Sequence, residues 1–112
     1  MEARAEARYM RGSAQKARLV VDMIRGRKVG EAISILQSAN RRFAPAVEKV
    51  LRSAIANCEN RNTDVDVDTL FVTTAYVNEG PRQKRIRPAP MGRAYRYQRR
   101  SSHIIVHVGT KE

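Results

Sequence analysis

The sequence predicts an α+β fold, with three helices packed on a small antiparallel sheet and a long protruding β-hairpin. Three observations predict it. Apolar residues recur at helical spacing between residues 15 and 59, and they alternate at strand spacing from Asp68 onward. Between Gly80 and Arg100 the chain is cationic and has no apolar face. Because an apolar stripe must be buried against another element, we expect the helices to cover the sheet in two layers.

A single domain accounts for the whole chain. A chain of 112 residues can bury only one modest core, and no internal repeat or low-complexity linker divides it. We expect a globular body at about residues 1–79 and 101–112, with residues 80–100 extended as the hairpin arm.

The first helix is expected at Gln15–Arg25. Ser13 precedes it and can act as the N-cap, while Gly26 follows it and can adopt positive φ at little cost. Helical spacing then assigns four residues to its buried stripe: Leu19, Val20, Met23 and Ile24.

Two further helices follow. The second runs from Val29 to about Ala39, and the third begins near Arg42 or Phe43, because Pro45 is tolerated only in a first turn. The third helix shows the clearest periodicity, and its buried face is expected to hold Ala44, Val47, Leu51, Ala54, Ile55 and Cys58.

The strands are expected at the two ends of the chain. Glu2–Met10 forms a short edge strand, and Asp68–Gly109 forms one long antiparallel hairpin. The apolar alternation changes phase near Thr73 and Thr74, which predicts a β-bulge there. The hairpin tip is assigned to Pro88, Ala89, Pro90, Met91 and Gly92.

The charge of the chain favours a polyanionic partner. Lys and Arg number 22 against 11 Asp and Glu, which gives a net charge of +11. No apolar stretch approaches the roughly 20 residues that a membrane-spanning helix needs, and no signal-peptide pattern opens the sequence. Nucleic acid is therefore the leading class of partner, and an intracellular, cytoplasmic protein is expected.

The arm carries the most specific signal. Its eight cations have no acidic residue among them, whereas a solvated surface normally mixes signs. Arginine can hold phosphate oxygens with two donors and can stack on bases. The residues expected to bind phosphates are Arg82, Lys84, Arg85, Arg87, Arg93, Arg96, Arg99 and Arg100. Tyr95 and Tyr97 lie between them, and base stacking or cross-strand packing would suit both.

A second basic group surrounds the first helix. Part of it is explained by the helix dipole, which favours cations at the C-terminal end. The remaining explanation is contact with RNA, for which the candidates are Arg11, Ser13, Lys16, Arg18, Arg25, Arg27 and Lys28.

Catalytic and metal sites are not expected. Cys58 is the only cysteine, and it lies far from His103 and His107, so the ligand set of a zinc site is incomplete. Asp64, Asp66 and Asp68 resemble the start of a calcium loop, but Thr69 stands in place of its turn glycine and Ala75 in place of its bidentate glutamate. We therefore expect a protein that is not an enzyme and that needs no cofactor.

The chain resembles a known family, the universal large-subunit ribosomal protein number twenty-two. The matching residues extend from the first helix, through the third, to the hairpin: Ser13, Lys16, Arg18, Leu19, Val20, Asp22, Ile24, Arg25, Gly26, Lys49, Val50, Leu51, Ser53, Ala54, Ala56, Asn57, Asn60, Tyr76, Val77, Glu79, Gly80, Pro81, Lys84, Arg85, Pro88, Gly92, Arg93, Ala94, Ser102, His103 and Ile104. Departures are local: Ala14 stands where the family often has proline, and Ala89 and Pro90 stand where it commonly has Arg-Ala.

The resemblance implies partners that periodicity and charge do not identify. It implies a structural protein that binds several domains of 23S rRNA, contacts neighbouring ribosomal proteins, and lines the nascent-peptide exit tunnel with its hairpin tip. By family position, Ser102 and His103 join the expected RNA contacts. Two other classes compete with this interpretation. A membrane-surface or acidic-protein adaptor would need an amphipathic edge beside the arginines, and a nuclease would need an acid or base cluster there.

Overall fold

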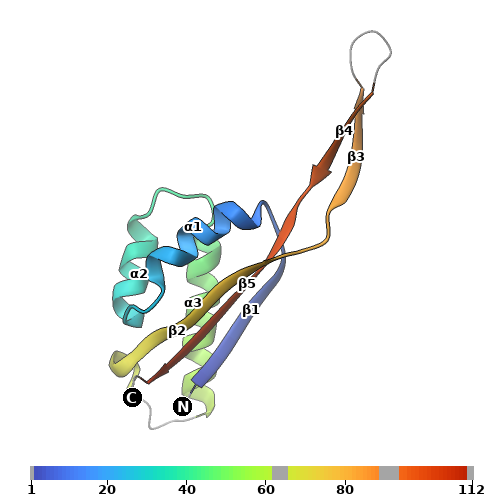
Figure 1. The fold of residues 1–112 in the computed structure, drawn as a ribbon. Coiled ribbons are helices and arrows are strands. Elements are labelled where there is room, and N and C mark those ends of the chain that lie inside the picture. The colour runs from blue at the N-terminus through green and yellow to red at the C-terminus, as the bar shows by residue number, and fades with distance from the viewer. Residues whose placement is uncertain (1, 62–65, 89–93, 111–112) are drawn as a thin grey trace.

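The computed structural model describes residues 2–61, 66–88 and 94–110, and gives the backbone alone at residue 2 and in 83–98. In these residues the predicted α+β fold is confirmed, because three helices cover one face of an antiparallel sheet and a hairpin projects from it (Figure 1). The elements are β1 (Glu2–Arg11), α1 (Ala14–Ile24), α2 (Val29–Ser38), α3 (Ala44–Arg61), the 3-10 turn η1 (Val67–Thr69), β2 (Leu70–Glu79), β3 (Gln83–Pro88), β4 (Ala94–Arg99) and β5 (Ser101–Thr110).

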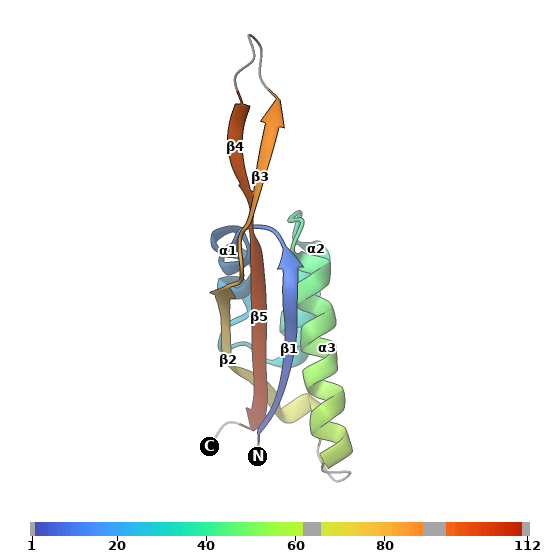
Figure 2. The same cartoon turned by 90° about the vertical axis from the view of Figure 1, so that its right-hand side faces the viewer.

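The sheet of the body has the order β1-β5-β2, with both outer strands antiparallel to the central one. Figure 2 looks at the strands with α1 and α2 behind them and α3 beside β1, so one face of the sheet is left uncovered. The pairing of β2 with β5 shifts register between Val72 and Thr74, which confirms the predicted bulge. A second shift, between Ala7 and Met10 in β1, was not predicted.

The arm continues the body hairpin as a separate two-stranded ribbon. Strands β3 and β4 pair from Gln83 with Arg99 to Pro88 with Ala94. The molecule measures 65 × 26 × 18 Å, and its radius of gyration is 17.3 Å, against about 13 Å for a compact chain of this length. The arm therefore sets the long dimension. The predicted tip residues Ala89–Gly92 lie outside the described residues.

The core lies between the sheet and the helices. Helix α3 presents the predicted face, with Val50 added to it and Ile55 only partly buried. From β5 the three alternating residues predicted to point one way are fully buried against the helices: Ile104, Val106 and Val108. The apolar side chains spaced at 3.6 residues on the helices and at 2 residues on the strands therefore pack into one continuous core.

Helix α1 has the predicted position but a different orientation. Val20 and Ile24 are buried as expected, whereas Leu19 and Met23 are 51% and 37% exposed. Ala17 and Val21 occupy the buried stripe in their place. Both stripes have helical spacing, and the sequence alone does not distinguish them. The observed rotation turns Arg18 of α1, and Arg25 directly after the helix, toward the edge of the sheet.

Those arginines cover the outer edge of β2. Arg18 donates from Nε and Nη2 to the carbonyl oxygen of Val77, at 3.2 and 3.0 Å. Arg25 donates in the same way to the carbonyl of Ala75, at 3.0 and 2.7 Å. Farther along the edge, Val72 exchanges backbone hydrogen bonds with the turn after α1. Carbonyls at this edge, which a further strand would otherwise satisfy, are therefore bound by α1 and the turn after it.

The opposite edge belongs to β1, and α3 lies beside it (Figure 2). Asn57 of α3 donates from Nδ2 to the carbonyl oxygen of Arg4 at 2.9 Å. Helices therefore contact both outer strands through side chains as well as through the core.

Replacing Arg25 with alanine is expected to lower the free energy of unfolding by about 1 kcal/mol, because one edge carbonyl loses both donors. For a domain of this size the melting temperature should fall by about 4 to 8 °C. Lys16→Ala, on an exposed position of the same helix, is the matched control and should change stability by less than about 0.5 kcal/mol. Equal melting temperatures for the two variants would contradict a stabilising role for Arg25.

Candidate nucleic-acid interface

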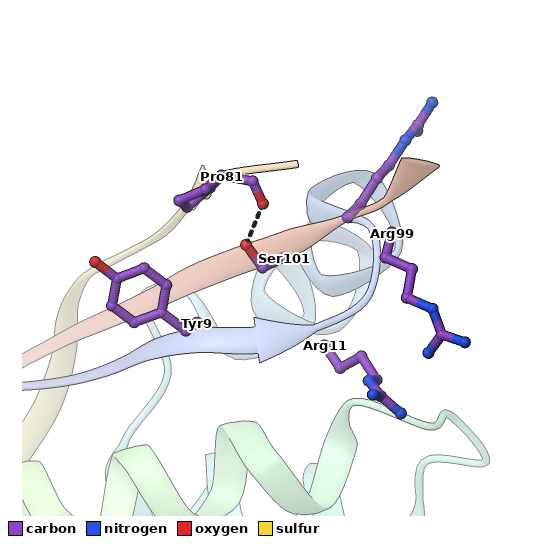
Figure 3. A pocket seen from close by; sticks show the side chains of 6 residues that line it. Tyr9, Arg11, Pro81, Arg99 and Ser101 are labelled. Carbon is purple, nitrogen blue, oxygen red and sulfur yellow. Dashed lines mark hydrogen bonds between the residues drawn. The ribbon is translucent and has the colours of Figure 1, made fainter. Parts of the chain in front are cut away.

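A cavity of about 320 Å³ opens where the arm leaves the body (Figure 3). We call it the root cavity. It is lined by residues of β1 and of the two segments that join the arm to the body: Tyr9, Arg11, Pro81, Arg99, Arg100 and Ser101. Its three arginines are exposed. In the described part of the chain none of them forms an ion pair with a carboxylate, so their charges face solvent.

Hydrogen bonds fix the walls of the root cavity. The Gly80 amide donates to the Ser101 carbonyl at 2.9 Å, and the Gly12 amide donates to the Arg100 carbonyl at 2.9 Å. The Ser101 hydroxyl donates to the Pro81 carbonyl at 2.7 Å, as Figure 3 shows. A Cβ on Gly80 would lie 2.5 Å from that hydroxyl oxygen, so a side chain at position 80 would displace the Ser101 hydroxyl from its place in the wall.

Tyr9 lies at the unpredicted irregularity of β1. Its φ is +57°, a left-handed value that is uncommon for a bulky residue. Its backbone N–H donates to Nδ1 of His103 at 3.0 Å, and the two rings meet edge to face with centroids 4.9 Å apart. The Tyr9 ring is nevertheless 66% exposed. His103, expected at the RNA surface, thus contacts the backbone that presents Tyr9.

A second cavity, of about 390 Å³, adjoins the start of α1. Its apolar floor includes Phe43, and Gly12 lets that ring approach, since a Cβ there would overlap it. The predicted candidates Ser13 and Lys16 line this cavity. Arg41 and Arg42, from the segment between α2 and α3, join them and were missed by the sequence analysis. Residues 11–13 connect the two cavities, so cations continue from the arm root to the start of α1.

The remaining cations near α1 have partners within the protein. Arg18 and Arg25 bind carbonyls of β2, and Arg25 also pairs with Asp22 at 2.7 Å. Arg27 pairs with Glu31 at 3.1 Å. Lys28 places Nζ 6.0 Å from the centre of the Phe71 ring. Because these contacts explain the four side chains structurally, they support RNA binding less than the cations of the two cavities do.

Apart from Arg99 and Arg100, which line the root cavity, the predicted sites on the hairpin and at its base divide into three groups. Arg82 is exposed and contacts Glu79 at 3.4 Å. Ser102 is fully buried, so RNA cannot reach its side chain in this conformation. Its hydroxyl has no hydrogen-bond partner among the described residues. The side chains of the others lie outside the description: Lys84, Arg85, Arg87, Arg93 and Arg96, with Tyr95 and Tyr97 between them.

On the uncovered face of the sheet, two arginines are paired with a carboxylate, unlike the arginines of the root cavity. Glu6 bridges two arginines, at 2.7 Å to Arg8 and 2.8 Å to Arg4. The hydrogen bond from Arg8 holds the pKa of the Glu6 carboxyl below its usual value, and Arg4 acts in the same direction. Tyr76 and His107 form a second ring pair on this face, with centroids 6.4 Å apart.

Among the described residues, no group of three or more His, Cys, Asp or Glu side chains is arranged to hold a metal ion. The helices in the same part of the chain include none with the length and apolarity to cross a membrane.

The fold and surface define a class, the small basic α+β proteins that carry a projecting hairpin on an arginine-lined root. The family described as ribosomal protein L22p/L17e matches residues 5–109. The large ribosomal subunit protein uL22 of Solibacter usitatus (strain Ellin6076) is 68% identical over 112 residues, which are 100% of this chain and 99% of the relative. The protein of the same name from Macrococcus caseolyticus (strain JCSC5402) is 51% identical over 112 residues, 90% of its length. The chain belongs to the ribosomal protein L22p/L17e family.

Proposed function

We propose that this chain is a structural constituent of the large ribosomal subunit that binds 23S rRNA and places its hairpin tip at the wall of the nascent-peptide exit tunnel. The observation that carries the ribosomal role is the family match over residues 5–109. The names of both relatives specify the large subunit. Neighbouring ribosomal proteins and the nascent peptide are the further partners proposed, and the cytoplasmic ribosome is the location.

The structure supports RNA as the main partner through the placement of unpaired charge. Arg11, Arg99 and Arg100 surround one cavity at the base of the arm, and Lys16 lies beside the next. Phosphate contacts of this kind position a protein on RNA without reading its sequence. The membrane-surface alternative would need an amphipathic apolar edge beside the arginines, and the sequence from Gly80 to Arg100 has no apolar face.

The tunnel assignment comes from the family resemblance, and two features of the arm suit it: its length and the composition of its tip. The arm extends the molecule to 65 Å, long enough to reach through a layer of packed RNA. The tip sequence, Pro88–Gly92, carries no charge, while arginines precede and follow it. A neutral tip suits a passage for peptides of every sequence, because strong charges there would retain some of them.

Deleting Ala89–Met91 is the test of this assignment. Large subunits should still contain the protein in sucrose gradients, because the body and the root cavity are intact. The effect should appear instead as altered sensitivity to tunnel-binding antibiotics or altered pausing on arrest peptides. Ribosomes that assemble normally and match the wild type in both assays would contradict the tunnel role. A wild-type protein absent from large subunits would contradict the ribosomal role itself.

A further inference from the structure

We propose that the root cavity holds one unpaired nucleotide of the RNA, with its base against the ring of Tyr9 and its phosphate among Arg11, Arg99 and Arg100. The inference rests on the proposed rRNA-binding function and specifies the ligand of that surface. At about 320 Å³, the cavity is near the lower end of the ~300–1,000 Å³ range of small-molecule sites. It therefore suits a single nucleotide rather than a helix.

The first argument is the state of Tyr9. Its 66% exposure is the highest among the large apolar side chains of the described residues. Its positive φ also costs conformational energy, which residues at functional sites often carry. A core role does not explain an exposed ring on a strained backbone. A ligand that covers the ring does, because every base offers an aromatic face for stacking.

The second argument is that the ring is held in place before any ligand arrives. His103 accepts the Tyr9 N–H at Nδ1 and packs edge to face against the phenol ring. Gly80 leaves room for His103, since a Cβ there would lie 3.3 Å from two atoms of the imidazole. Because the ring is already oriented, stacking loses less conformational entropy than it would with a mobile side chain.

The third argument is the chemistry around the ring. The side chains of Arg11 and Arg99 extend in the same direction from the root, away from Tyr9 (Figure 3). No carboxylate lines the cavity among the described residues. An aromatic face with guanidinium groups at one side matches the two halves of a nucleotide, a flat base and a charged phosphate. A fully paired helix offers only the phosphates.

The test compares two RNA duplexes that differ by one bulged adenosine. The wild-type protein should bind the bulged duplex more tightly, and Tyr9→Ala should remove that preference by weakening only the bulged complex, about 5-fold to 150-fold. Tyr9→Phe should retain the preference. Tyr76→Ala is the matched control, because it removes another partly exposed tyrosine packed beside a histidine but outside the root cavity. It should leave both affinities unchanged.

A spectroscopic readout keeps the test independent of folding effects in Tyr9→Ala. Wild-type protein labelled with 3-fluorotyrosine should show a shift of the Tyr9 resonance, assigned with Tyr9→Phe, on adding the bulged duplex but not the paired one. Equal binding of both duplexes by the wild type and Tyr9→Ala, with no selective shift, would overturn the nucleotide site alone. Absence of salt-dependent binding to either duplex would overturn the proposed RNA-binding function, and this inference with it.

Discussion

Leu51→Asp is expected to prevent accumulation of folded protein. Leu51 is fully buried on the apolar face of α3, within the core between the helices and the sheet. A carboxylate there would have no partner, and burying an unpaired charge costs several kcal/mol. Domains of this size are stable by only about 5–15 kcal/mol, so the substitution removes a large part of the total. Soluble yield and circular dichroism during heating would measure the loss.

Ser53→Asp is the control for this experiment. It places the same side chain two residues away on an exposed position of α3, where the change in stability should stay within about 0.5 kcal/mol. A melting temperature for Leu51→Asp equal to that of the control would show that this face of α3 does not form the core.

Replacing Arg11, Arg99 and Arg100 together with glutamine is expected to weaken rRNA binding strongly and to reduce its salt dependence. Each phosphate contact contributes about 0.7 to 0.9 to the slope of log affinity against log salt concentration. Loss of three contacts should therefore reduce the slope by about 2 to 3. Titrations of a 23S rRNA fragment at several salt concentrations would give both slopes. All three side chains are exposed, so the fold should be retained.

A variant that loses the same number of positive charges elsewhere on the surface distinguishes binding through the root cavity from attraction by net charge. Replacing Lys49, Arg52 and Arg61 with glutamine removes the same number of charges from exposed positions along α3. Its slope should change less than that of the root variant. Equal reductions in the two variants would mean that net charge alone drives binding and that the root cavity is not an anchor.

The sequence predicted the elements because their apolar periodicities are local. It did not predict how α1 is rotated, because Leu19 with Met23 and Ala17 with Val21 form stripes of equal helical spacing. The difference between them arises only when α1 packs beside β2. The small Ala17 can then approach the sheet, while Arg18 reaches an edge carbonyl.

The candidate site, too, could be predicted only in part from the sequence. An arginine that binds phosphate and one that binds a carbonyl look alike in sequence, so Arg25 was grouped with Arg11 although only Arg11 lines the root cavity. Arg41 and Arg42 were missed because they lie between helices, outside any charge run. Tyr9 had no signal either. Its role depends on a left-handed backbone and on His103, which is distant in the sequence but adjacent in space.

The protected sheet edges have a consequence for the chain before it meets RNA. An open edge strand is a template on which another chain can add a strand, and this is a common route to aggregation. In this protein α1 and its turn bind carbonyls along β2, and Asn57 binds one on β1. These contacts leave fewer free carbonyls, above all along β2, on which a second copy of the chain could pair. The arginines of α1 that do not line a cavity would thus serve the unassembled protein, during the interval between synthesis and incorporation.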